Sequence, residues 1–169
     1  MIRLLGGILV ASGMTFLGFC AARELTERVY GIETMIDGLN QLRRELKQRG
    51  RGLPELLEQL SEQTALPAAA LFQQCAQGCC HLDERTLAEN WQDGVKKLRI
   101  LSKETQMAMG ALGVVLGRYE VSGQCEAITQ VVTILEEERS KAKEEQRRLG
   151  KVYQVLGLTG GTFLTILLL

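Results

Sequence analysis

Proline and aromatic residues are scarce in this sequence. Proline occurs only 2 times among 169 residues, and aromatic residues make up 5% of the chain. Long, unbranched side chains such as those of Leu, Glu, Gln and Arg are common instead, and they lose little rotamer freedom when a helix forms. The composition therefore predicts an all-α protein with essentially no sheet.

An excess of charge of either sign is also missing. The chain has 20 basic and 20 acidic residues, which gives a formal net charge of zero. Nucleic-acid-binding proteins normally gather a basic excess on one face, whereas here the signs are mixed within short runs such as residues 43–45 and 136–139. Such mixed runs are usually solvated helix faces. We therefore expect no nucleic-acid partner.

The cysteines lack the regular spacing of a disulfide framework. Their number is odd, which suits a reducing compartment better than a disulfide-stapled secreted domain. We therefore expect the folded domain to lie in the cytoplasm. The five cysteines are Cys20, Cys75, Cys79, Cys80 and Cys125.

One cluster, Cys75-x-x-x-Cys79-Cys80-His81, has the residue types of a metal or redox site. Thiolates and an imidazole can bind zinc, but structural zinc sites usually pair their ligands as Cys-x-x-Cys and need a second pair. His81 is the only histidine, and nothing in the sequence marks an adjacent nucleophile on a strained turn. We therefore expect no enzyme, no cofactor and no metal, and keep a metal- or redox-sensing membrane protein as the alternative function.

Two uncharged stretches lie at the ends of the chain. The first covers residues 4–22, between Arg3 and Arg23, and the second covers residues 152–169. As a helix the first reaches about 28 Å at roughly 1.5 Å per residue, close to the hydrocarbon thickness of a bilayer. We expect an N-terminal transmembrane helix in 1–22, a cytoplasmic helical bundle in 23–151 and a C-terminal transmembrane helix in 152–169.

A cleaved signal peptide is the alternative for the first stretch, because Cys20-Ala21-Ala22 offers small residues after an apolar run. The helical pattern of apolar residues continues beyond Ala22 without a break, and this favours a membrane helix. A small pore-forming protein is a further alternative if both stretches span the bilayer.

Both stretches contain small residues at helical spacing. Such pairs let two helix backbones approach closely in lipid, although glycine is also simply common in membrane helices. The candidate packing pairs are Gly7 with Ala11, Gly18 with Ala22 and Gly157 with Gly161.

A helical stripe follows the first stretch. Its apolar residues recur at steps of three and four, which predicts that the membrane helix continues into the next domain. Gly50 and Gly52 end this helix, and Pro54 suits the first turn of the next one. The stripe consists of Leu25, Val29, Ile32, Met35, Ile36, Leu39, Leu42 and Leu46.

Two short helices are expected next. One begins near Pro54 and the other opens at Pro67. Their apolar residues are Leu56, Leu57 and Leu60 in the first, which face inward, and Ala70, Leu71 and Cys75 in the second.

A fourth helix is expected with Asp83 as its N-cap. Leu87, Trp91, Val95 and Leu98 then lie on one side, at steps of four and three. Trp91, the only tryptophan, is predicted to be a core anchor.

A fifth helix is predicted over 102–116 and a loop over 117–123, with Ser122 as the N-cap of the last helix. That helix begins near Gln124, and no proline interrupts it, so one continuous rod of more than roughly forty residues is expected. Its buried residues are Ile128, Val131, Val132 and Leu135.

A set of motifs runs along nearly the whole chain in a fixed order. They are Leu4-Leu5-Gly6, Gly18-Phe19, Thr26-Glu27-Arg28, Leu39-x-x-Leu42-x-x-Glu45-Leu46, Leu71-Phe72, Trp91, Leu112-Gly113-x-x-Leu116-Gly117, Gln124 and Lys151-x-Tyr153-x-x-Leu156-Gly157. In this order and spacing they resemble the stage III sporulation protein AB family of endospore-forming bacteria. The turn at 49–54 departs from the Tyr-Gly-x-Thr-Pro-Leu-like run of that family, although Pro54 is kept.

The resemblance implies a non-enzymatic assembly component of a secretion-like channel complex between mother cell and forespore. It implies a helical bundle similar to the cytoplasmic domain of the platform proteins of type II secretion and type IV pilus systems. It also implies an anchor in the mother-cell membrane facing the forespore. Other subunits of the complex, including a cytoplasmic export ATPase, are the implied partners, and a homo-oligomer is a further possibility.

Candidate interaction residues lie at the turns that a rigid helical scaffold would display. Arg49 and Arg51 occupy the turn after the first long helix, and Arg118 and Glu120 occupy the loop before the last one. The motifs of the resemblance add Glu27, Arg28 and Gln124.

The orientation in the membrane follows from charges near the two stretches. Beside the first stretch the basic residues are nearly balanced between its two sides, whereas beside the second they lie on the domain side. The positive-inside rule therefore predicts a cytoplasmic domain. The basic residues beside the second stretch are Lys141, Lys143, Arg147, Arg148 and Lys151.

Overall fold

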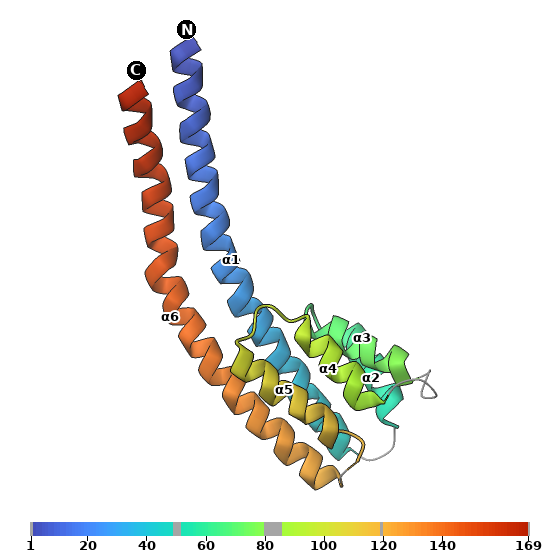
Figure 1. Cartoon of the computed structure of the whole chain (residues 1–169). Helices are drawn as coiled ribbons and strands as arrows, with labels where there is room; N and C mark the ends of the chain where they lie inside the picture. The colour runs from blue at the N-terminus through green and yellow to red at the C-terminus, as the bar shows by residue number, and fades with distance from the viewer. Residues whose placement is uncertain (1, 49–51, 80–85, 119, 169) are drawn as a thin grey trace. The chain divides into compact units, whose positions relative to one another are not determined.

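The computed structural model describes the backbone of residues 2–48, 52–79, 86–118 and 120–168. Near the chain ends it describes the side chains of residues 12, 13, 16 and 18–48, and of 120–152, 155, 159 and 163. In these ranges the chain forms six α-helices and no strand, which confirms the all-α prediction (Figure 1).

Two long helices and four short ones make up the fold. The last helix is continuous over 48 residues, as its lack of proline predicted. The helices are α1 (Ile2–Lys47), α2 (Leu53–Gln63), α3 (Ala68–Cys79), α4 (Leu87–Lys96), α5 (Lys103–Val115) and α6 (Val121–Leu168).

The chain divides into two compact units. The central unit is Tyr30–Arg139, and the terminal unit combines Met1–Val29 with Ser140–Leu169. Both α1 and α6 contribute residues to each unit. The predicted boundaries at residues 22 and 152 concern the membrane and stay predictions.

The core of the central unit is built on the predicted stripe of α1. From Ile32 to Leu42 the five stripe positions are buried, whereas Leu46 is half-buried. The expected α6 residues, from Ile128 to Leu135, are buried as well. Periodicity alone therefore located the faces that these two helices bury.

The short helices pack in chain order, α2 against α3, α3 against α4 and α4 against α5. Pro54 lies in the first turn of α2, and the predicted leucines at 56, 57 and 60 are buried. In α3, Leu71 and Cys75 are buried but Ala70 is exposed, because Ala68 and Phe72 occupy the inward face instead.

The start of α4 differs from the prediction. Asp83 lies outside the described residues, and Thr86 is the N-cap. The Thr86 hydroxyl accepts the Glu89 backbone N–H at 3.3 Å, while the Glu89 carboxylate accepts the Thr86 N–H at 2.8 Å. This reciprocal capping box satisfies two backbone donors that the helix cannot satisfy itself. The helix ends at Lys96, so Leu98 is buried in the connection after it.

The start of α6 also differs. The helix begins at Val121, three residues before the expected start, so Ser122 lies inside the first turn and does not cap the helix. Gly117, with φ of +80°, makes the turn after α5 in a conformation that other residues rarely adopt. The fifth helix closely matches its prediction, with Ser102 as N-cap.

In the terminal unit α1 and α6 run side by side in opposite directions. Arg28 pairs with Glu145 at 3.0 Å, and the Gln146 amide donates to the Thr26 hydroxyl at 2.9 Å. Nearer the chain ends several large apolar side chains are exposed, among them Phe16, Phe19, Val155 and Phe163.

None of the helices, as far as their residues are described, includes a segment with the length and hydropathy that crossing a membrane requires. Of the predicted small-residue pairs, Gly18 is half-buried and Ala22 is buried. The side chains at Gly7 and Ala11 and at Gly157 and Gly161 fall outside the described set.

Candidate assembly surface

Trp91 fixes how α4 lies against α5. Its side chain is fully buried, which confirms the core-anchor prediction, and its indole N–H donates to the Met109 carbonyl at 2.7 Å. Phe72 of α3 approaches the same ring, with centroids 6.3 Å apart. A Cβ on Gly113 would come within 2.6 Å of the Trp91 ring, so the glycine permits the close approach.

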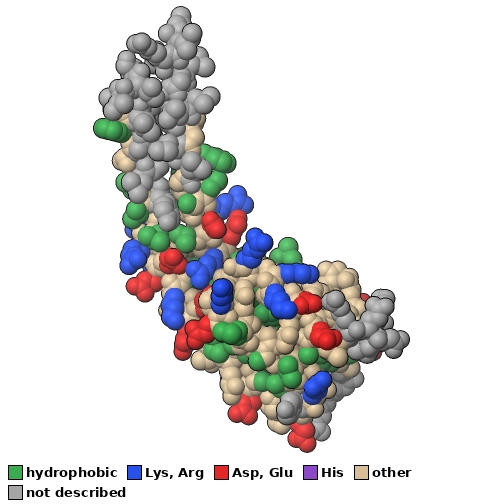
Figure 2. All heavy atoms as spheres, in the orientation of Figure 1, with side chains coloured by type: hydrophobic (Ala, Val, Ile, Leu, Met, Phe, Trp, Pro, Cys, Tyr) green, Lys and Arg blue, Asp and Glu red, His purple; other side chains and the backbone are tan. Residues whose placement is uncertain are grey.

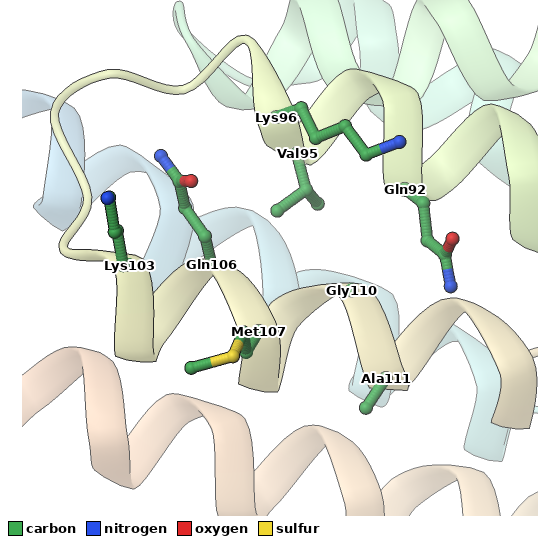
Figure 3. Close-up of a pocket in the computed structure, with 8 residues that line it drawn as sticks. All are labelled: Gln92, Val95, Lys96, Lys103, Gln106, Met107, Gly110 and Ala111. Atoms are coloured by element: carbon green, nitrogen blue, oxygen red, sulfur yellow. The ribbon is translucent and has the colours of Figure 1, made fainter.

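A groove runs between these two helices beside the tryptophan. Its volume is about 630 Å³, and the side chains of Gln92 and Val95 point from α4 toward α5 (Figure 3). We call it the α4–α5 groove. It is lined by Gln92, Val95, Lys96, Lys103, Gln106, Met107, Gly110 and Ala111.

The α4–α5 groove has an apolar floor and a basic rim. Met107 is 71% exposed, which is unusual for a large apolar side chain. Lys96 forms an exposed pair with Asp93 at 3.0 Å, whereas Lys103 has no ion pair with any described residue. The Gln106 amide donates to the Leu98 carbonyl at 2.9 Å, which holds this side of the groove in place.

The lining residues of the groove suit binding better than catalysis. They include no cysteine, histidine, serine or carboxylate, so the described wall offers no thiol or hydroxyl nucleophile and no imidazole or carboxylate to act as its base. An exposed methionine beside lysines fits an apolar side chain flanked by carboxylates. Figure 2 shows charges of both signs elsewhere on the described surface, with apolar side chains between them.

Glu138 of α6 holds the first turn of α5 in place. Its carboxylate, 6% exposed, accepts the Ser102 backbone N–H at 2.8 Å and the Ser102 hydroxyl at 3.2 Å. A carboxylate at a helix N-terminus also interacts favourably with the helix dipole. The prediction that residues 136–139 form a solvated helix face is therefore wrong at Glu138, because tertiary packing places the start of α5 over this side chain.

The candidate interaction residues do not gather in one place. Glu27 pairs with Arg23 at 2.8 Å on the exposed surface of α1, and Arg28 pairs with Glu145. Arg118 and Glu120 are exposed in the connection before α6.

The remaining candidates divide into two cases. Gln124 is buried, with 7% exposure, so its side chain belongs to the interior of the central unit. Arg49 and Arg51 lie outside the described residues. Sequence reasoning missed Met107 and Lys103, although Met107 lies off the inward stripe of Thr105, Met109 and Leu112 and could have been noticed there.

The cysteine cluster is described only in part. Cys75 is buried and Cys79 is half-buried, whereas Cys80 and His81 lie outside the described residues. Burial, and to a lesser extent the neighbouring Cys79, raises the pKa of the Cys75 thiol to about 12. The thiol therefore stays protonated at neutral pH, and it is the thiolate that binds metals and attacks as a nucleophile. No group of three potential metal ligands occurs among the described side chains.

Comparison with known proteins identifies the family of this bundle. The family model described as stage III sporulation protein AB matches residues 3–169. The chain belongs to the stage III sporulation protein AB family. The predicted family resemblance is therefore confirmed over nearly the whole chain.

A relative and a solved structure carry the same name. Stage III sporulation protein AB of Bacillus subtilis (strain 168) is 26% identical over 174 residues, covering 100% of both chains. A solved structure of stage III sporulation protein AB has a TM-score of 0.62 at 23% identity, covering 72% of this chain and 98% of that one. The part of the chain that this structure covers thus has the same fold. The family ties the chain to sporulation, and the relatives are named as sporulation proteins, not as enzymes.

Proposed function

We propose that the chain is a non-enzymatic, membrane-anchored assembly component of the sporulation machinery, which binds a partner subunit through the α4–α5 groove. The observation that carries this proposal is the groove itself, an apolar surface with Met107 exposed and lysines at the rim. The Trp91 anchor and the Glu138 contact hold its two walls in fixed positions. A rigid, partly apolar surface loses little entropy on binding.

The partner that fits is an amphipathic segment with an apolar anchor and neighbouring carboxylates. The anchor would cover Met107 and Val95, and the carboxylates would lie near Lys103 and Lys96. A cytoplasmic export ATPase is the partner that we favour, in a complex of the secretion-like type between mother cell and forespore. The resemblance to platform proteins of type II secretion supports this choice.

Membrane anchoring by both chain ends is part of the proposal. Phe16 and Phe19 on α1 and Val155 and Phe163 on α6 are exposed, and lipid would remove these side chains from water. The basic residues from Lys141 to Lys151 lie on the domain side of the second uncharged stretch, which favours a cytoplasmic domain. We place the protein in the mother-cell membrane that faces the forespore.

The groove is tested by a matched pair of substitutions on α5. Met107→Glu puts a carboxylate into the apolar floor, whereas Val114→Glu puts the same group on an exposed position of the same helix outside the groove. In pull-downs from sporulating cells we expect the first variant to lose its partner subunit and the second to keep it. Equal capture by Met107→Glu and the parent would remove the groove from consideration.

The charge of the partner is tested at the rim. Lys103→Glu should weaken capture at least about tenfold, since like charges then face each other. Arg99→Glu, an exposed reversal in the connection outside the groove, is the control. If the two reversals have the same effect, the partner is not acidic at this point.

Orientation is tested by cysteine labelling at an exposed site of α6. A chain with Glu144→Cys should resist a membrane-impermeant maleimide in intact cells and react after lysis, because residue 144 is exposed on the domain side. Reaction before lysis would reverse the topology and exclude contact with a cytoplasmic motor.

A further inference from the structure

The terminal unit has an uneven distribution of charge in a chain that is neutral overall. Residues 1–23 and 146–169 contain no acidic residue, although the whole chain has 20 of them. Both segments therefore carry only positive side-chain charge. The basic residues in them are Arg3, Arg23, Arg147, Arg148 and Lys151.

Two of these cations line a second groove, of about 470 Å³, between α1 and α6 of the terminal unit. Arg147 and Lys151 lie four residues apart, on the same face of α6, and both are exposed. Gly150 leaves open space beside them, since nothing lies within 4 Å of where its Cβ would be. The lining of this terminal groove is Ala22, Thr26, Gln146, Arg147, Gly150 and Lys151.

The neutral polar groups of the terminal groove are already bonded to one another. The Gln146 amide donates to the Thr26 hydroxyl at 2.9 Å, and that hydroxyl donates to the Ala22 carbonyl at 3.2 Å. These bonds fix the wall of the groove that α1 and α6 share. The guanidinium of Arg147 and the ammonium of Lys151 take no part in these bonds.

The two cations of the terminal groove have no carboxylate partner within the part of the chain that the structure describes. Of the acidic side chains nearby, Glu27 pairs with Arg23 and Glu145 pairs with Arg28, while Glu144 is exposed to solvent. Arg147 and Lys151 form no ion pair with any residue that the structure describes. A guanidinium can bind a phosphate with two parallel hydrogen bonds, and a lysine adds a second positive charge.

Apolar side chains lie next to the terminal groove along each helix. Phe19 precedes Ala22 by one turn of α1, and Val155 follows Lys151 by one turn of α6, and both are exposed. A ligand with a phosphate for the two cations and hydrocarbon for these side chains satisfies both features. Basic pockets between helices at a membrane surface are typical sites for anionic lipid head groups.

We propose that the terminal groove binds the phosphate of an anionic phospholipid head group through Arg147 and Lys151. The inference rests on the membrane anchoring in the proposed function, and on no partner subunit. It gives the terminal unit a preference for anionic lipid that a purely apolar anchor would lack.

The test uses the purified full-length chain and vesicles of two compositions. In flotation with phosphatidylcholine alone or mixed with phosphatidylglycerol, the parent should bind the anionic vesicles at least about tenfold more tightly, because each basic residue near the surface contributes about a factor of five. The variant Arg147→Gln with Lys151→Gln should lose most of that preference. The variant Arg147→Lys with Lys151→Arg, which keeps both charges, should retain it.

A matched double variant controls for charge alone. Lys141→Gln with Arg148→Gln removes two exposed cations from the same part of α6 but from outside the groove. This control should lose clearly less preference than the groove variant. Equal losses would mean diffuse attraction to the surface and would overturn the site.

The remaining outcomes separate the site from its alternatives. Inorganic phosphate, added at the concentration of accessible lipid phosphate, should not displace the parent from anionic vesicles. Full displacement would assign the groove to free phosphate instead of lipid. Flotation with no head-group preference would overturn the lipid site alone, whereas failure to float with either vesicle would overturn both the site and the membrane anchoring.

Discussion

The central unit and the terminal unit use the same two long helices but place large apolar side chains differently. In the central unit Ile32 and Leu39 of α1 are fully buried, whereas in the terminal unit Phe16 is 68% exposed. The central stretch of α1 alternates apolar and polar residues at helical spacing, but residues 4–22 carry no charge at all. A helix with one apolar stripe can bury that stripe against the rest of its own protein. A helix that is apolar on all sides needs an apolar environment from elsewhere.

The largest effect is expected at the centre of the central unit. Trp91→Ala should lower the free energy of unfolding by about 3 to 5 kcal/mol, through lost burial and the cavity left behind. The substitution also leaves the Met109 carbonyl without its indole donor. Denaturant unfolding of the full chain in detergent, followed by circular dichroism, measures the change. Gln92→Ala, next to it but exposed, is the control, and coinciding curves for parent and Trp91→Ala would mean that the core lies elsewhere.

A smaller effect is expected where α5 approaches the tryptophan. Gly113→Ala should cost about 1 to 3 kcal/mol, because the added Cβ would lie 2.6 to 2.8 Å from Trp91 atoms. Gly110→Ala, in the same helix, meets only the Gln92 side chain at 3.8 Å and should be neutral or stabilise by up to about 1 kcal/mol. The same unfolding measurement compares them, and equal values would show that α4 and α5 are not held in close contact.

The buried carboxylate of α6 gives a third comparison. Glu138→Gln should cost about 1 to 3 kcal/mol, since one acceptor oxygen is replaced by an amide NH2 group, which cannot accept a hydrogen bond from Ser102. Glu137→Gln, on the exposed neighbour, should change stability by less than about 0.5 kcal/mol. A loss of stability shared by both variants would point to net charge and not to the Ser102 contact.

The smallest effect on folding is expected in the terminal unit. Phe19→Gln should change the unfolding free energy of the central unit by less than about 0.5 kcal/mol, because the side chain is exposed and makes no core contact. Binding to vesicles should fall in the same variant, since moving a phenylalanine side chain from water into lipid contributes about 1.5 to 3 kcal/mol. Unchanged vesicle binding together with a lower melting temperature would show that Phe19 is a packing residue of the protein.

Local signals explain most of what the sequence predicted. The stripe from Val29 to Leu42, the proline at the start of α2 and the lack of proline in α6 act within a few turns of helix. The wrong helix starts came from choosing one capping residue among several nearby. At α4 the pair Thr86 and Glu89 forms a complete capping box, which is a stronger signal than Asp83 alone.

The sequence by itself determined that the chain is all-α, which face each long helix buries, and to which family it belongs, because periodicity and motif spacing are properties of neighbouring residues. Only the tertiary structure decided that Glu138 meets Ser102, that Met107 stays exposed, and that Arg147 lies with Thr26 around one groove. The residues that meet are far apart in the chain. Both these contacts and the exposure of Met107 depend on how whole helices pack. In the sequence, an acidic side chain that stays in solvent cannot be told from one that is buried, because a neighbouring helix is what buries it.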